Sequence, residues 1–241
     1  MLDLTQIPAN RLAMLDTAAL FRGPHGGGGP DCRHCARELA YEIVTGRNAD
    51  ANPPDCTEMF SMLPNLNDGP WSSDALRTEV LRPYLRPMLM LDPARDRMRA
   101  FAVADYAVRV IAPAVLDRAG LTDWSAKLRE LAPLVAVSAP GAARAAADAA
   151  RAAADAAYAT ADAADAAAKR SAASAAISAA RAASFADTDA ARAADAASLA
   201  ADASLAAASF AAPHGSPPAA ARAADWEIHV RGLLDRVCAI A

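Results

Sequence analysis

An alanine-rich run constrains this chain more than any other feature of its sequence. More than half of residues 142–212 are alanine, and the run contains neither glycine nor proline. Alanine is the strongest helix former, so the whole run is expected to be helical. Its other residues recur at alternating steps of four and three, which is a heptad period. The residues that follow this period are Arg144, Asp148, Arg151, Asp155, Tyr158, Asp162, Asp165 and Lys169.

These heptad positions are mostly polar, whereas an ordinary coiled coil carries large apolar residues there. We therefore predict that the polar stripe faces solvent and that the alanine faces pack against close neighbours. A single helix over the run would extend roughly 105 Å at about 1.5 Å per residue. We expect instead two or three helices folded back on one another, with breaks near residues 169–171 and near residues 187–189. The alternative is one long rod that dimerises.

Apolar spacing and capping residues predict further helices before this run. The expected helices cover residues 8–20, 31–46, 55–63, 73–88 and 92–120, with a short piece after Thr122. The expected N-cap residues are Asp31, Asp55, Ser73, Asp92 and Thr122. Gly46 is expected to end the second helix. Pro83 and Pro87 predict a kink or a split, and Pro113 predicts a bend, because proline removes a backbone donor.

The C-terminal segment follows a linker at residues 213–218 and has an apolar stripe of its own. The stripe consists of Ala223, Trp226, Val230, Leu233, Val237 and Ile240. It predicts an amphipathic helix that docks on the preceding bundle. The sequence thus predicts an all-α fold in three parts: an N-terminal multi-helix domain at 1–136, an alanine-rich hairpin or bundle at 137–212, and a linker with a docking helix at 213–241.

Charge and hydropathy disfavour several classes of protein. The formal net charge is -4, and acidic and basic residues are intermixed in the alanine-rich run, so we expect no nucleic-acid partner. No window reaches the roughly 18 to 20 uncharged apolar residues that a membrane helix needs, so we expect no membrane partner. The first residues lack the basic start of a signal peptide. We therefore expect a cytoplasmic protein whose cysteines do not form disulfides.

Residues 25–38, HGGGGPDCRHCARE, contain the densest group of chemically versatile side chains. Together with Cys56, the residues His25, Cys32 and Cys35 are of the types that ligate structural zinc. Cys32 and Cys35 also fall on the predicted apolar stripe of their helix, where cysteine behaves as a small hydrophobic residue. We favour core cysteines after a glycine loop and expect no cofactor. Zinc at these four residues and a redox dithiol are the alternatives.

Asp105 and Arg109 lie four residues apart on an apolar helix, a spacing at which they can form an ion pair. We interpret the pair as a structural polar network that fixes helix packing, with Arg97 or Arg99 as a further member. A binding pocket is the alternative. A third possibility is an enzyme with its pocket at Asp105 and Arg109. A pocket there requires the two side chains to line a cavity rather than a helix interface.

The remaining candidate bases are histidines, the side chains whose ordinary pKa lies closest to neutrality. His34, four residues before Glu38, and His229, near Trp226, are expected to be exposed side chains rather than ligands or bases. The chain has no Gly-x-Ser-x-Gly nucleophile turn. We therefore identify no catalytic residue and predict that the protein is not an enzyme.

Two stretches carry a resemblance to known families: residues 31–68 and residues 97–121. Together with the alanine-rich half, they resemble an uncharacterised family of alanine-rich helical proteins from high-GC actinobacteria and their phages. The matching residues are Cys32, Cys56, Asn67, Asp68, Asp105 and Arg109. The second stretch is also faintly similar to predicted all-helical immunity proteins of bacterial toxin systems. The resemblance implies a helical fold and no known reaction.

Together these observations predict a non-enzymatic protein-interaction or structural module, with an immunity or phage accessory role as its finer form. Such a module would bind a protein partner, or a second copy of itself, through alanine-rich helix faces. The alternative function is a small metal- or ligand-binding helical protein that uses the region of Cys32, Cys35 and Cys56.

Overall fold

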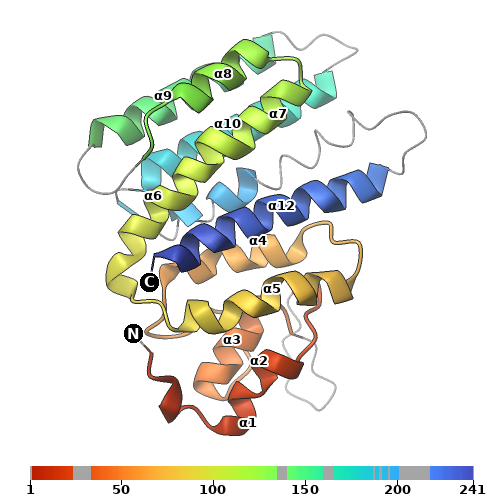
Figure 1. The fold of residues 1–241 in the computed structure, drawn as a ribbon, viewed down its shortest axis with the longest axis vertical. Helices are drawn as coiled ribbons and strands as arrows, with labels where there is room; N and C mark the ends of the chain where they lie inside the picture. Colours follow the sequence, from red (N-terminus) through yellow and green to blue (C-terminus); the bar gives the residue numbers. More distant parts are fainter. Residues whose placement is uncertain are drawn as a thin grey trace.

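The predicted all-α fold is confirmed by a computed structural model, in which the described residues form helices and turns with one isolated bridge between Leu20 and His34 (Figure 1). The structure describes residues 2–23, 34–134, 140–159, 166–186, 188–189, 192–194, 196–200 and 218–240. Its N-terminal elements are η1 (Leu4–Gln6), α1 (Ala9–Leu12), α2 (Met14–Thr17), α3 (Ala36–Thr45), η2 (Glu58–Met62), α4 (Leu63–Asp68) and α5 (Asp74–Leu89). The later elements are η3 (Pro93–Arg95), α6 (Asp96–Tyr106), η4 (Ala107–Ile111), α7 (Ala112–Arg118), α8 (Thr122–Glu130), α9 (Pro140–Ala159), α10 (Ala166–Phe185) and α12 (Pro218–Ala239).

Helix α3 begins later than the sequence predicted. Cys35 is its N-cap: the Sγ atom accepts a hydrogen bond from the Glu38 backbone N–H at 3.4 Å, and the Glu38 carboxylate accepts one from the Cys35 N–H at 2.9 Å. This reciprocal pair is a capping box with a thiol in the place of the usual hydroxyl. The prediction of Asp31 as the cap is therefore wrong. Gly46 ends the helix in a left-handed conformation, as predicted.

The helices around residues 55–68 also differ from the prediction. Asp55 has a positive φ of 59° and does not cap a helix, because Thr57 accepts the capping hydrogen bond from the Met59 N–H. The chain then continues as α4 through Pro64 instead of ending there. Proline is compatible with the first turn of a helix, where its missing N–H has no intrahelical partner anyway.

Prolines elsewhere also have smaller effects than expected. Helix α5 runs without a break through Pro83 and Pro87, so the predicted split is wrong. Its predicted cap is confirmed, since the Ser73 hydroxyl accepts a hydrogen bond from the Leu76 N–H.

The predicted cap at Thr122 is wrong, because α8 begins at that residue without a side-chain cap. The helix predicted at residues 8–20 is two short helices, α1 and α2.

The long helix predicted at residues 92–120 contains a π-helical segment, η4, between α6 and α7. The Ala112 N–H donates to the Ala107 carbonyl, five residues earlier, and Pro113 follows directly. A proline in a regular helix loses its own hydrogen bond and clashes with the carbonyl four residues before it. The wider π turn relieves that clash; it contains Arg109 and begins two residues after Asp105.

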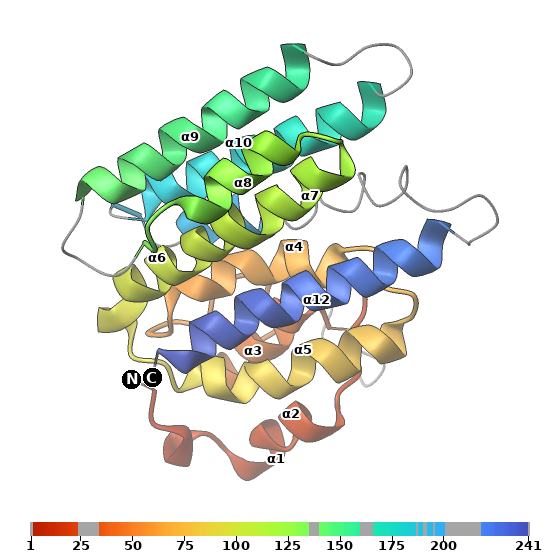
Figure 2. The same ribbon diagram turned by 45° about the horizontal axis from the view of Figure 1, so that its top comes forward.

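The alanine-rich helices fold back on one another, as predicted. Figure 2 shows α9 and α10 side by side, so the chain does not form the single rod considered as the alternative. The first break lies between residues 159 and 166, so its predicted position at 169–171 is wrong: Lys169 is inside α10. The second break is confirmed, since α10 ends at Phe185 and the Asp189 carboxylate accepts a hydrogen bond from the Arg192 N–H.

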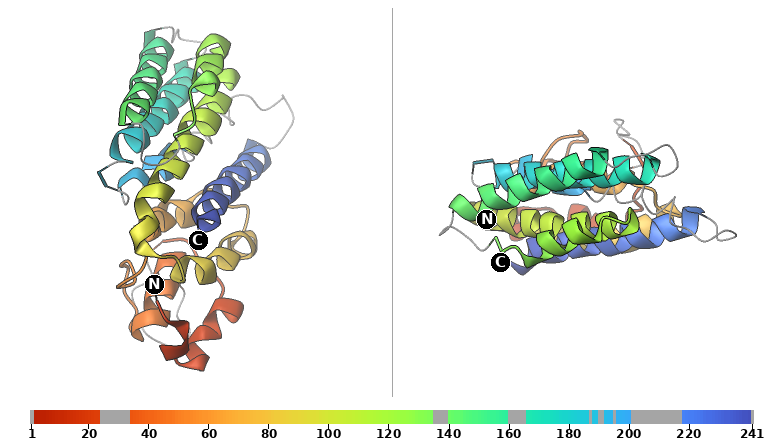
Figure 3. Two further views of the ribbon diagram at one scale, coloured as in Figure 1. Left: turned by 60° about the vertical axis from the view of Figure 1, so that its left-hand side comes forward. Right: turned by 90° about the horizontal axis from the view of Figure 1, so that it is seen from above.

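Helix α10 lies between α9 on one side and the continuous α6–η4–α7 helix on the other (Figure 3). Its alanines are accordingly buried around most of the helix, and those of α9 are buried along one face. The heptad residues of α9 are exposed, as predicted, and they are Arg144, Asp148, Arg151, Asp155 and Tyr158. The alanine faces thus serve contacts within the chain, while self-association through them remains a prediction.

Helix α12 docks on a different surface from the one predicted. It packs against α5 and α6 of the N-terminal part rather than mainly on the alanine-rich helices (Figure 2). Two glycines allow this close approach: a Cβ atom at Gly232 would collide with the Tyr106 ring, and one at Gly69 would collide with the Trp226 ring. Among the helices that the structure describes, none combines the length and apolar character needed to cross a bilayer.

Candidate functional site

Asp105 and Arg109 form the ion pair that their spacing predicts. The Arg109 Nε and Nη2 atoms donate to the two Asp105 carboxylate oxygens at 2.7 and 2.8 Å, a bidentate arrangement. The backbone N–H of Leu134 donates to the same carboxylate at 2.9 Å and so fixes the segment after α8 to α6. These hydrogen bonds to Asp105 are the main reason that the pKa of Arg109 is raised above its ordinary value. The Arg109 guanidinium therefore stays charged at neutral pH.

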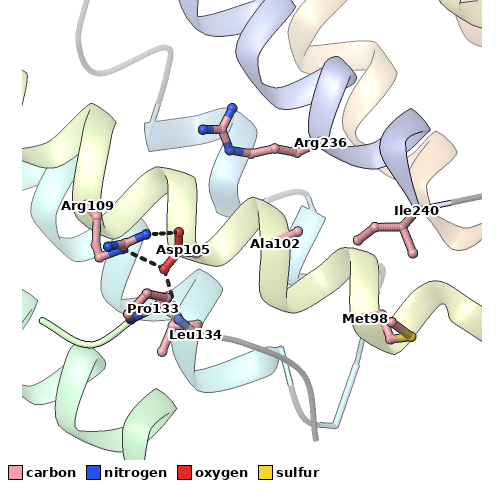
Figure 4. Close-up of a pocket in the computed structure, with 8 residues that line it drawn as sticks. All are labelled: Met98, Ala102, Asp105, Arg109, Pro133, Leu134, Arg236 and Ile240. Carbon is pink, nitrogen blue, oxygen red and sulfur yellow. Dashed lines mark hydrogen bonds and ion pairs between the residues drawn. The ribbon is translucent and has the colours of Figure 1, made fainter.

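The pair lines an open pocket of about 350 Å³ rather than a closed helix interface (Figure 4). The pocket lies between α6, the segment after α8 and the end of α12. Its other lining residues are mostly apolar, and they are Met98, Ala102, Pro133, Leu134, Arg236 and Ile240. The structure thus meets the condition set for the pocket alternative. We call this feature the α6–α12 pocket.

Arg236 brings a second guanidinium to the α6–α12 pocket. Its Nη1 atom donates to the Gly232 carbonyl at 2.8 Å, and its central carbon lies 3.9 Å from the centre of the Tyr106 ring. This stacking holds the guanidinium in place. Within the described part of the chain, no carboxylate forms an ion pair with Arg236. Of the guanidinium groups that the structure places at the pocket, that of Arg109 is paired with Asp105, and that of Arg236 has no ion-pair partner among the described residues.

A fully buried arginine holds the end of α12 at the pocket. The Arg99 Nε and Nη2 atoms donate to the Ile240 carbonyl at 3.0 and 2.6 Å, and Nη1 pairs with the Asp96 carboxylate at 2.8 Å. Asp96 is itself buried and also accepts a hydrogen bond from the Thr57 hydroxyl. Arg99 is therefore part of a separate network and is not the partner of Asp105 that the sequence suggested.

The geometry of Asp105 suits binding rather than proton transfer. A general base needs a free carboxylate oxygen within reach of a substrate proton. Both oxygens of Asp105 already accept charge-assisted or backbone hydrogen bonds, from Arg109 and Leu134. The pair therefore acts as a fixed dipole in the pocket wall.

The cysteine region gives no comparable site among the described residues. No group of three or more histidine, cysteine, aspartate or glutamate side chains there could hold a metal. Burial raises the pKa of the Cys35 thiol to about 12 and that of Cys56 to about 11, so both are protonated at neutral pH. Two of the four proposed zinc ligands, His25 and Cys32, lie outside the described residues, and so does the suggested link between Cys32 and Cys56.

Both histidines predicted to be exposed are buried, each with 5% of its surface accessible. The His34 Nε2 atom lies 2.7 Å from the Glu42 carboxylate, one helical turn beyond the predicted neighbour Glu38. Glu38 is occupied in the capping box at the start of α3. His229 lies edge-on to the Tyr106 ring, and its pKa is lowered to about 4, chiefly by burial.

Sequence reasoning identified the Asp105–Arg109 pair but not the rest of the pocket. Arg236 lies one residue before Val237 of the apolar stripe, and Ile240 is the last member of that stripe. Their spacing places both at the edge of the buried face of α12. The sequence could not show which helix this face would contact, so it could not place Arg236 beside Asp105.

Comparisons of the chain with protein-family profiles, with curated proteins and with solved structures find no match.

Proposed function

We propose that this protein is a non-enzymatic binding module that recognises a protein partner through the α6–α12 pocket. The observation that carries the proposal is the placement of Asp105, Arg109 and Arg236 around an open, mostly apolar cavity. Apolar pockets with a few fixed polar groups are typical binding sites. An immunity or phage accessory role is the finer form of this proposal, and its support is the resemblance of residues 31–68 and 97–121.

The pocket fits the part of a partner that anchors an interface. Interface energy is concentrated in a few side chains that fill pockets, surrounded by a polar rim. The α6–α12 pocket is lined by apolar side chains such as Met98 and Ile240 together with charged groups. The Met98 side chain is 39% exposed and is therefore accessible to a partner. One apolar side chain of a partner would cover it.

The proposal is tested by filling the pocket and comparing what the protein captures from its own host. Tagged wild-type protein is compared with Ala102→Trp, which occupies the pocket, and with Met98→Glu, which adds a charge to its wall. The control is Ala145→Trp, which places the same bulk on the exposed face of α9. Thermal unfolding of each variant verifies that it folds.

The proposal predicts proteins that copurify with the wild type and with Ala145→Trp but are lost from both pocket variants. It is contradicted if every captured protein binds all four forms equally, or if folded wild-type protein captures none.

A further inference from the structure

We infer that the α6–α12 pocket recognises an apolar group that carries one carboxylate, in the form of the C-terminal residue of a partner polypeptide. This inference rests on the proposed function, because it uses the same pocket and names the chemistry of its occupant. It is carried by the charges that face the cavity and by the kind of wall between them.

The charged side chains that line the α6–α12 pocket favour a ligand with one negative charge. Asp105 and Arg109 neutralise one another through their bidentate hydrogen bonds, so they contribute a dipole and no net charge. Arg236 lines the same cavity and forms no ion pair among the described residues. Among the described residues that line the pocket, Arg236 is therefore the positive charge without an ion-pair partner, and this charge favours a monoanion. A doubly charged phosphate would have only one unpaired guanidinium and would face the Asp105 carboxylate as well.

The guanidinium of Arg236 is positioned to bind a carboxylate. A guanidinium is planar and binds a carboxylate through two parallel hydrogen bonds. Arg236 is already ordered, because it stacks on the Tyr106 ring and donates through Nη1 to the Gly232 carbonyl. Its remaining N–H groups are available to a ligand. An ordered arginine loses less side-chain entropy on binding than a free one.

The apolar wall and the volume of the cavity suit one small apolar side chain. Beyond Arg236 the cavity is bounded by Met98, Ala102, Leu134 and Ile240. Its volume of about 350 Å³ is near the lower end of the range for small-ligand sites. A leucine-sized side chain fits this space better than a long acyl chain. A C-terminal residue supplies both the apolar side chain and the carboxylate, which are the two features that the pocket offers to bind.

The test is an NMR titration of the purified full-length protein with N-acetylleucine, which mimics a C-terminal residue. N-acetylleucinamide is the neutral control, and octanoate represents a free fatty acid. We expect N-acetylleucine to bind about tenfold or more tightly than the amide, because a charge-assisted hydrogen bond contributes at least that factor. Octanoate should bind more weakly than N-acetylleucine.

Two substitutions that should change the affinity for N-acetylleucine in opposite directions test the inference further. Arg236→Gln removes the uncompensated charge and should weaken N-acetylleucine binding by about tenfold or more. Asp105→Asn removes the charged partner of Arg109 and should strengthen the binding of N-acetylleucine. Arg231→Gln is the matched control, since Arg231 lies on the same helix, pairs with Glu227 at 2.8 Å and should leave the affinity unchanged.

Equal affinity for the acid and its amide, no binding of either compound, or unchanged affinity in both pocket variants would overturn the inference. Tighter binding of octanoate than of N-acetylleucine would overturn the polypeptide source while retaining the carboxylate. The proposed function fails separately. If neither compound binds but Ala102→Trp still loses a captured protein, the pocket is an interface with another chemistry. If N-acetylleucine binds and no captured protein is lost, only the protein partner is contradicted.

Discussion

Buried polar side chains determine how the two halves of this chain meet. Arg99 is fully buried, pairs with Asp96 and donates to the Ile240 carbonyl at the end of α12. His229 is also buried on α12, and no hydrogen-bond partner of its Nδ1 atom lies among the described residues. An unpaired polar atom of this kind is costly in the protein interior. The position nevertheless tolerates a histidine because the ring is neutral at pH 7.

The first prediction concerns the pH dependence of stability. Burial, reinforced by the Arg118 charge, lowers the pKa of His229 to about 4, below the value of about 6.5 expected in the unfolded chain. Between these two values the unfolded state binds a proton that the native state does not, so stability falls as the pH falls from 6.5 toward 4. The expected loss between pH 7 and pH 5 is about 2 kcal/mol.

Urea unfolding of the wild type and of His229→Gln at pH 7 and pH 5 measures this contribution. The variant lacks the titrating ring, so its loss of stability over this interval should be smaller by that amount. Equal losses in the two proteins would show that His229 is not buried in the neutral form.

At the scale of single elements, close helix approach depends on small residues at particular positions. Alanine fills the contact between α9 and α10, whereas glycine is needed where α12 meets α6. Gly232 has no room for a Cβ atom because the Tyr106 ring lies against it, while Gly141 of α9 has open space around its Cα atom. Gly141 is the second residue of α9, whereas Gly232 lies in the interior of α12, so the two positions differ in helix position as well as in what surrounds them.

The second prediction uses the same substitution at both positions. Gly141→Ala should stabilise the protein by about 0.5 to 1 kcal/mol, because alanine restricts the unfolded chain and favours the helix. Gly232→Ala should destabilise it by about 1 to 3 kcal/mol, because the added methyl group pushes α12 away from Tyr106. Chemical unfolding measures both free energies. Two changes of the same sign would contradict the packing of α12 on α6.

These elements also show how far sequence reasoning reaches. Periodicity identified the helical class, the polar stripe of α9 and the buried stripe of α12, because those patterns reflect which side of a helix faces solvent. It placed the first turn of the alanine-rich run too late, since the sequence has no glycine or proline to mark the reversal. It also missed the thiol cap of Cys35, because cysteine is not among the usual capping residues.

The α6–α12 pocket was only half visible in the sequence for a related reason. Asp105 and Arg109 are neighbours on one helix, so their spacing predicts their contact. Arg236 reaches the pocket only because α12 crosses back to α6. This packing depends on the missing side chains of Gly69 and Gly232, which leave room for the Trp226 and Tyr106 rings. A contact between residues so far apart in the chain depends on tertiary packing that a single sequence does not reveal.

At the scale of the whole molecule, the chain returns twice. The alanine-rich helices turn back along α6 and α7, and α12 then crosses to α5 and α6, so segments from both ends of the sequence lie together (Figure 3). The three predicted parts, with boundaries at residues 136 and 212, thus share contacts. The boundaries themselves remain a prediction, because residues 135–139 and 201–217 lie outside the described ranges.

The third prediction follows from this folded-back arrangement. A globular chain of 241 residues has an expected radius of gyration of about 18 Å. A rod built from the alanine-rich run would extend roughly 105 Å by itself. Small-angle X-ray scattering at low protein concentration should give a radius of gyration of about 18 Å. A distance distribution that reaches beyond 100 Å would contradict the antiparallel packing of α9 and α10.

The central claim is that the α6–α12 pocket binds an apolar group that carries one carboxylate, and methyl NMR tests it most directly. In protein labelled at methionine and isoleucine methyl groups, N-acetylleucine should shift the signals of Met98 and Ile240, which line the pocket. The exposed side chains of Met90 and Ile228 do not line it and should serve as internal controls. Shifts confined to the two control residues, or no shift at Met98 and Ile240, would contradict the claim.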